Sequence, residues 1–186
     1  MESIRAFVGI DLDNNTREVL GKIQLDSLKM NEFSSVKLVD PQLAHITLSF
    51  LGNKTRSELA SISSALRAVS FHPFCVLLYG VGVFPSMKKM RVIHVKLSKS
   101  EDLKALYGRV GKALENEREH DKKFDPHITL GRVKRYAPAE VDQLATRIAP
   151  FSSSYFGRFN VDSFQLKKST LTRTGPIYDT LEEFLL

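Results

Sequence analysis

The sequence contains one cysteine, Cys75, in 186 residues, so no disulfide can form within the chain. A protein without internal disulfides fits a reducing compartment such as the cytoplasm. Long apolar runs are also missing: the longest, roughly from 74 to 84, contains two glycines and is far shorter than the ~20 residues that span a bilayer. The N-terminus MESIRAFVGID has an early acidic residue and does not look like a secretory signal. We therefore expect a cytoplasmic protein that does not enter a membrane.

Acidic residues are outnumbered by basic ones, which gives a net charge of +6 and a sequence pI of about 9.4. Such a field attracts polyanions, among which RNA is the obvious candidate. A solvated basic face that only maintains solubility is an equally common alternative, so charge alone does not decide the partner. The basic residues gather in the later part of the chain, at Lys122-Lys123, 132–135, Arg158 and Lys167-Lys168.

The periodicity of apolar residues predicts a strand-rich chain with four interspersed helices. Several expected strands follow one another directly, which favours an α+β fold with mainly antiparallel sheets over a doubly wound parallel sheet. The length fits one domain, or two small lobes that share a core. Strands are expected at 4–12, 36–39, 43–51, 74–78, 90–97, 124–133, 156–166 and 178–185, and helices at 14–30, 55–69, 100–114 and 138–148.

The clearest internal repeat is the tetrapeptide HITL, which occurs at 45–48 and again at 127–130. The chain has only five histidines, so finding two of them in identical tetrapeptides argues against coincidence. Side chains alternate between the faces of a strand, so His45 and Thr47 share one face while the isoleucine and leucine point to the core. Each copy therefore predicts one imidazole and one hydroxyl on the exposed face of a strand.

Two imidazoles that flank one site suit phosphoryl chemistry. With an ordinary pKa of ~6.5, one of His45 and His127 can be neutral and the other protonated near neutral pH. The neutral ring accepts a proton from an attacking hydroxyl, and the protonated ring gives one to the departing oxygen. Each transfer contributes ~10²–10⁴ in rate. The hydroxyls of Thr47 and Thr129 can donate hydrogen bonds to the phosphate oxygens.

Other interpretations of these residues are weaker. A histidine on a strand is usually a surface or a satisfied core residue, but the duplication argues against that here. A zinc site needs further ligands, and Asp40 and Asp125 are better interpreted as turn residues. Cys75 lies in the apolar run PFCVLL, where a free cysteine is normally a small buried hydrophobe rather than a nucleophile. We expect no metal, and we interpret the remaining histidines, His72, His94 and His120, as structural or surface residues.

With their flanks, the two copies HITLSFLG and HITLGRVK resemble the paired H-x-[T/S]-x signatures of the 2H phosphoesterase superfamily. More narrowly, they resemble the bacterial and archaeal 2′-5′ RNA ligase family, also described as RNA 2′,3′-cyclic phosphodiesterases. The resemblance covers nearly the whole chain. It includes RAFVGIDLD at the start, VGVFPSMKKMRVIHV in the middle, and LKKSTLTRTGPIYDTLEEFLL at the end.

This resemblance implies one bilobal domain over residues 1–186, with two mainly antiparallel sheets, pseudo-two-fold symmetry, outer helices and a central cleft. It implies hydrolysis of a terminal RNA 2′,3′-cyclic phosphate to a 2′-phosphate without metal, nucleotide or other cofactor, and 2′-5′ ligation in reverse. By the family's pattern His45 is the proton donor to the 3′ oxygen and His127 is the base that activates water. Thr47 and Thr129 hold the phosphate.

Five further residues are candidates for binding the substrate. Arg132 matches an arginine that the family often has after its second motif and could clamp phosphate, although strict alternation would turn it away from the site. Arg91 is a lesser candidate. Phe7 and Phe50 could stack a base, although core packing is the more usual role for each. Ser49 stands where many members have lysine, so this chain would lack any contact made through that lysine.

The expected partner is RNA with a 2′,3′-cyclic phosphate end, with tRNA halves among the candidates, and nothing in the sequence demands more than a monomer. An RNA-binding module with the same scaffold and little turnover is the alternative function. It would show affinity that falls steeply with salt and survives the loss of both motif histidines. Whether hydrolysis or ligation is the cellular direction is left open by the residues.

Overall fold

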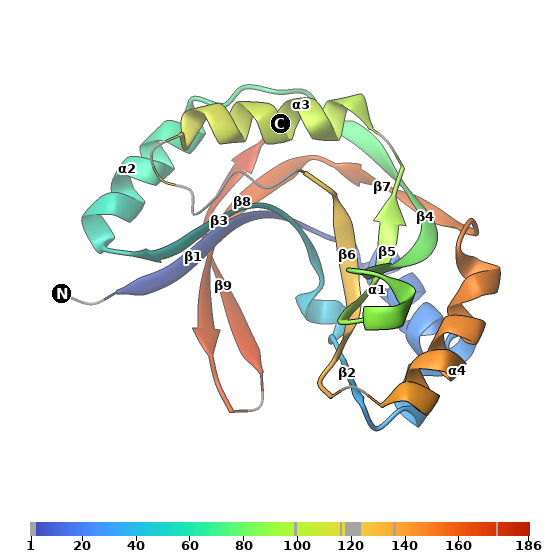
Figure 1. The fold of residues 1–186 in the computed structure, drawn as a ribbon. Coiled ribbons are helices and arrows are strands. Elements are labelled where there is room, and N and C mark those ends of the chain that lie inside the picture. Colours follow the sequence, from blue (N-terminus) through green and yellow to red (C-terminus); the bar gives the residue numbers. More distant parts are fainter. Residues whose placement is uncertain (1–2, 99, 116, 118–123, 136, 174) are drawn as a thin grey trace.

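The computed structural model describes residues 3–98, 100–115, 117, 124–135, 137–173 and 175–186. Its strands pair in antiparallel fashion throughout the described part of the chain and form one curled sheet (Figure 1). The strands span Ile4–Asp11 (β1), Val36–Leu38 (β2), His45–Lys54 (β3), Phe74–Phe84 (β4), Val92–Leu97 (β5), His127–Val133 (β6), Tyr155–Val161 (β7), Ser163–Leu171 (β8) and Pro176–Leu185 (β9).

The strand order is β7-β4-β5-β6-β3-β1-β8-β9, with β2 added beside β6. The sheet thus has two halves of four strands, which meet where β3 lies beside β6, the two strands that carry the HITL repeats. The bilobal α+β prediction is confirmed. The two expected sheets, however, are halves of one continuous sheet, since β3 and β6 pair directly through Ile46 and Ile128.

Each half is covered by two helices, α2 and α3 on one and α1 and α4 on the other (Figure 1). They span Asn14–Lys22 (α1), Arg56–Arg67 (α2), Glu101–Ala113 (α3) and Pro138–Ile148 (α4). Among the described residues, no helix is long and apolar enough to cross a bilayer. Thr55 and Glu58 form a capping box at the start of α2, and Ser100 caps α3. The buried helical side chains that hold these elements on the sheet include Leu20, Leu59, Ile62, Leu66, Leu103, Leu106, Val110, Val141, Leu144 and Ile148.

Three expected elements differ from the structure. The strand expected at 156–166 is two strands, β7 and β8, which lie in different halves of the sheet and are separated by a single residue. The helix expected to reach residue 30 ends at Lys22 and continues as a π-helical turn over Ile23–Ser27. β4 does not stop at residue 78 but continues to Phe84. Its pairing with β5 shifts in register between Leu78 and Val81, where Gly80 has a φ of +80°. Cys75 is exposed, not buried, because its neighbours Phe74 and Val76 face the core.

Candidate active site

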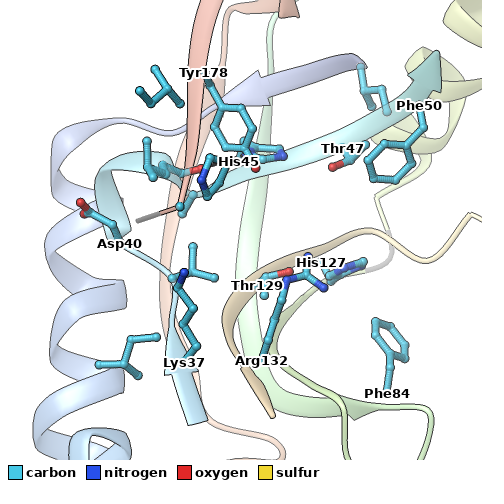
Figure 2. A pocket seen from close by; sticks show the side chains of 18 of the residues that line it. Lys37, Asp40, His45, Thr47, Phe50, Phe84, His127, Thr129, Arg132 and Tyr178 are labelled. Carbon is cyan, nitrogen blue, oxygen red and sulfur yellow. Dashed lines mark hydrogen bonds between the residues drawn. The ribbon is translucent and has the colours of Figure 1, made fainter. Parts of the chain in front are cut away.

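A cavity of about 800 Å³ lies over the junction of β3 and β6 (Figure 2). It is lined by both motif histidines and both motif threonines, His45, Thr47, His127 and Thr129. The predicted alternation is confirmed within each tetrapeptide, because the other motif side chains are fully or almost fully buried. These are Ile46, Leu48, Ile128 and Leu130.

The junction relates the two repeats by a local two-fold axis. Ile46 pairs with Ile128, and these are the same position of the two tetrapeptides. An antiparallel pair of equivalent residues has a two-fold axis between them, so the rest of each repeat is related by the same axis. In this register His45 lies toward Thr129, and His127 lies toward Thr47, as Figure 2 shows. The four polar side chains therefore form one cluster.

Both imidazoles are oriented by the same kind of hydrogen bond. His45 Nδ1 lies 2.9 Å from the carbonyl oxygen of Leu43, and His127 Nδ1 lies 2.8 Å from that of Asp125. A carbonyl oxygen can only accept, so Nδ1 carries the hydrogen in each ring. Each histidine therefore gains or loses its exchangeable proton at Nε2.

The surroundings of His45 are aromatic and charged. Its ring centroid lies 4.7 Å from that of Phe7 and 5.1 Å from that of Tyr178. Burial lowers the pKa of His45, and the charge of Lys167 adds to this, while the hydrogen bond to Leu43 acts in the opposite direction. Burial therefore favours the neutral form of His45.

A partly buried ion pair lies beside His45. Lys167 Nζ is 2.6 Å from each carboxylate oxygen of Asp11, and the lysine is nearly inaccessible to solvent. Asp11 is the cross-strand partner of His45 in β1. The charge of Asp11 raises the pKa of His45, whereas the charge of Lys167 lowers it. The two members of the ion pair therefore act on this pKa in opposite directions.

His127 packs against a different pair of rings. The centroid of Phe84 lies 4.9 Å from that of His127, and the centroid of His94 lies 5.1 Å away. His94 is buried, as the sequence interpretation allowed. Burial above all, with the neighbouring charges of His127 and Lys96, lowers the pKa of His94 to about 3. His94 is therefore neutral across the physiological pH range.

Both motif strands bulge at the last residue of the tetrapeptide. Leu48 is skipped in the pairing of β3 with β1, and Leu130 is skipped in the pairing of β6 with β5. An extra residue in one strand interrupts the alternation of faces. As a result, Phe50 and Arg132, which occupy equivalent positions after the bulges, both line the cavity. Strict alternation is wrong for Arg132, which faces the site.

Of the other residues predicted to bind the substrate, some line the cavity and others do not. Ser49 lines the cavity. Phe50 is 57% exposed at the rim, so core packing is the wrong interpretation for it, whereas Phe7 is buried beneath the His45 ring. Arg91 does not belong to the lining residues; its backbone bonds to Phe84 and Val133 at the start of β5.

The sequence interpretation missed several residues that complete the cavity. Tyr178 lies in the GPIY segment, which was a family signal but had no assigned role. Lys37 was missed because only the pairing of β2 with β6 places it opposite Arg132. Tyr107 and Phe124, which stack with centroids 3.9 Å apart, add a further aromatic wall. Lys122, Lys123 and His120 lie outside the described residues.

Comparison with known proteins agrees with this geometry. A family model described as the 2′-5′ RNA ligase superfamily matches residues 20–172. The chain belongs to this superfamily. A relative from Archaeoglobus fulgidus, named RNA 2′,3′-cyclic phosphodiesterase, is 37% identical over 97% of this chain and 99% of its own length. A Methanothermobacter thermautotrophicus protein of the same name is 33% identical over 98% of this chain and 99% of its length.

Solved structures of similar proteins share the fold. A crystal structure of a Thermus thermophilus protein superposes with a TM-score of 0.79 and 32% identity, over 98% of each chain. Escherichia coli LigT in apo form gives a TM-score of 0.78 over 100% of this chain and 99% of that one, with 21% identity. The curled sheet with its central junction is thus an architecture that this chain shares with other members of the superfamily. Among the described residues of this member, no three His, Cys, Asp or Glu side chains are grouped to hold a metal ion.

Proposed function

We propose that this protein is an RNA 2′,3′-cyclic phosphodiesterase, which hydrolyses a terminal cyclic phosphate to a 2′-phosphate. One observation carries the proposal: two imidazoles with identical Nδ1 hydrogen bonds lie on either side of a two-fold axis at the floor of one cavity. A neutral and a protonated imidazole in such an arrangement can move one proton in and one proton out of a reacting phosphate. The names of the relatives support the substrate class.

In the proposed reaction His127 Nε2 accepts a proton from water as the water oxygen bonds to phosphorus. The bond between phosphorus and the 3′ oxygen breaks, and protonated His45 gives its Nε2 proton to that oxygen. The products are a 2′-phosphate and a free 3′-hydroxyl. Thr47, Thr129 and Arg132 donate hydrogen bonds to the non-bridging oxygens, whose charge increases in the transition state.

The low pKa of His45 makes its donor role dependent on the substrate. A donor acts only while it is protonated, and activity falls as the pH rises above its pKa. Burial lowers the pKa of His45, but an anionic phosphate beside the ring favours the charged form and raises that pKa. We therefore expect the alkaline limb of kcat/KM, which reports the free enzyme, to lie at lower pH than that of kcat. Steady-state profiles between about pH 5 and 9 measure both, and coincident or reversed limbs would contradict the assignment.

Arg132 and Arg91 form a matched pair for testing the phosphate contact. Both were candidates in the sequence, but only Arg132 lines the cavity. We expect Arg132→Ala to lower kcat/KM by roughly 10–100-fold, the value of one charge-assisted hydrogen bond. Arg91→Ala should change it less than about twofold, because exposed charges outside the site are screened by salt. Equal losses in the two variants would show that the effect is general electrostatic attraction.

The proposed substrate is the 3′ end of an RNA chain rather than a free phosphate. Exposed Phe50 lines the cavity and offers a ring face on which a base can stack, and Tyr107 and Phe124 add aromatic rings to the lining. tRNA halves are one candidate source of such ends. We expect the protein to act as a monomer in the cytoplasm. Joining of RNA ends through a 2′-5′ bond would use the same groups in the same roles, with a 5′-hydroxyl in place of the attacking water.

The decisive experiment identifies the reaction product. The pure protein is incubated with EDTA and an oligoribonucleotide that ends in a 2′,3′-cyclic phosphate, and the product is identified by mass spectrometry and by digestion specific for 2′- or 3′-phosphate. A 2′-phosphate supports the proposal. A persistent cyclic end would contradict it, and salt-sensitive RNA binding that survives loss of both histidines would then favour the binding-module alternative.

A further inference from the structure

His94 is a buried polar ring that the proposed chemistry does not use. β5 places it opposite Thr129 of the second repeat, and only 3% of it is accessible to solvent. Its Nδ1 atom is buried and has no hydrogen-bond partner among the described residues. A buried nitrogen without a partner is unfavourable, and native proteins retain few of them. An apolar side chain would avoid this penalty, so the presence of histidine calls for an explanation.

The ring of His94 belongs to a three-ring cluster around His127. His94 stacks on Phe84 with centroids 4.1 Å apart and an interplanar angle of 16°. Both rings then meet His127 at a steep angle, 62° for His94 and 77° for Phe84. The hydrogen bond from Nδ1 to Asp125 holds one edge of His127. The two rings limit rotation about that bond, so they determine where Nε2 lies.

A glycine behind His94 fixes the position of the cluster. Gly82 of β4 pairs with His94, and a Cβ atom at this glycine would lie 2.7 Å from His94 Nε2 and 3.1 Å from its Cε1. Real Cβ atoms do not approach so closely, so any larger residue at 82 would push the ring away from β4. Because Phe84 already covers one face of His94, a displacement of this ring is transmitted to His127.

The first repeat has no equivalent of His94. There Gly9 pairs with Thr47, as His94 pairs with Thr129. The wall of His45 comes instead from Phe7 and from Tyr178 of β9. His94 is therefore one of the features that distinguish the surroundings of the two motif histidines.

We propose that His94 is a positioning residue for His127, which orients the base through ring contact from β5 while adding no charge to the site. This inference rests on the acid–base role proposed for His127. Neutrality follows from burial, since the pKa of His94 is about 3 and the ring stays uncharged wherever His127 works. A lysine or arginine in the same place would add a positive charge next to the base.

The test uses three variants and one control, assayed on an oligoribonucleotide with a 2′,3′-cyclic phosphate end. His94→Ala removes the ring, His94→Phe keeps an aromatic contact, and Gly82→Ala pushes the native ring forward. Misplacing a catalytic group by about 1 Å can cost on the order of 100-fold. We expect His94→Ala and Gly82→Ala to lower kcat by roughly 10–100-fold with KM nearly unchanged, and His94→Phe to recover most of kcat. Gly108→Ala is the control, because a Cβ there meets no other atom within 4 Å.

A spectroscopic readout separates positioning from general damage. In ¹⁵N-labelled protein the His127 ring signals should show one tautomer in the wild type and a mixture in His94→Ala. Unchanged kcat and unchanged His127 signals in both His94→Ala and Gly82→Ala would overturn the proposal. If His94→Ala does not fold, Gly82→Ala and His94→Phe decide the question in the same way. Full activity of His127→Ala would instead refute the acid–base role itself, and this outcome does not involve His94.

Discussion

Replacing either motif histidine with alanine is expected to lower kcat by roughly 10²–10⁴-fold, which is the usual contribution of one positioned proton-transfer group. Both rings are held by equivalent hydrogen bonds to carbonyl oxygens, so neither can take over the other's position. The double variant His45→Ala/His127→Ala should be little worse than the poorer single variant, because groups that act in one concerted step are not additive. Single-turnover measurements on the cyclic-phosphate oligonucleotide give these rates.

His72 provides the matched control for this experiment. Its side chain is exposed, its Nε2 lies 3.3 Å from Asp102 Oδ1, and it is not among the residues that line the cavity. His72→Ala should keep the wild-type rate and pH profile. Each motif variant should also lose a different limb of the bell-shaped profile: His127→Ala the acid limb, because a base must be deprotonated, and His45→Ala the alkaline limb. Loss of the same limb in both variants would contradict the assigned roles.

Acid should destabilise the protein strongly, and a large part of this effect should come from His94. An unfolded histidine binds a proton below a pH of ~6.5, whereas folded His94, with a pKa of about 3, does not. The unfolded state therefore binds more protons between these values, and stability is lost as the pH falls below ~6.5. At pH ~4.5 the effect of this single group is roughly 2–3 kcal/mol in the free energy of unfolding.

Urea unfolding of the wild type and His94→Phe at a series of pH values measures this contribution. The variant should be as stable as the wild type or more stable at pH ~7, because it buries no unpaired nitrogen, and it should lose less stability on acidification. Other groups, including His45 with its lowered pKa, act in the same direction, so the difference between the two proteins is the informative quantity. Parallel curves would mean that His94 titrates normally in the folded state.

Much of the site could be predicted because its determinants are local. Alternation within four residues places His45 and Thr47 on one face, and repetition does the same for the second copy. The box of Thr55 and Glu58 marks the start of α2 because both partners lie within one helical turn. Where neighbours in the sequence supply the interaction, the pattern of residue types was sufficient.

The features that were missed depend on pairing between distant strands. The bulge at Leu130, which turns Arg132 into the site, exists only because β5 and β6 pair in a shifted register. The two strands expected as one at 156–166 were not separated because a single residue, Asp162, joins them, and no glycine or proline marks the point where the chain passes to the other half of the sheet. His94 carries no motif, and its role emerges only when β4, β5 and β6 are side by side.

The two-fold axis through Ile46 and Ile128 has a consequence for the direction of the reaction. A perfectly symmetric cavity would accept a cyclic phosphate in two poses related by half a turn, with the histidines exchanging tasks between them. Phe50 and Arg132, at equivalent positions, break this degeneracy, because one attracts a base and the other an anion.

Stacking of one base contributes ~1–3 kcal/mol, and each ~1.4 kcal/mol separates the two poses by a factor of ten. Phe50→Ala should thus lower kcat/KM, because the productive pose loses its stacking contact, and the loss should exceed that in Tyr155→Ala, which removes a comparably exposed ring outside the cavity. The duplicated motifs supply the reactive groups. The residues that differ between the two halves determine which histidine acts as the base and which as the acid.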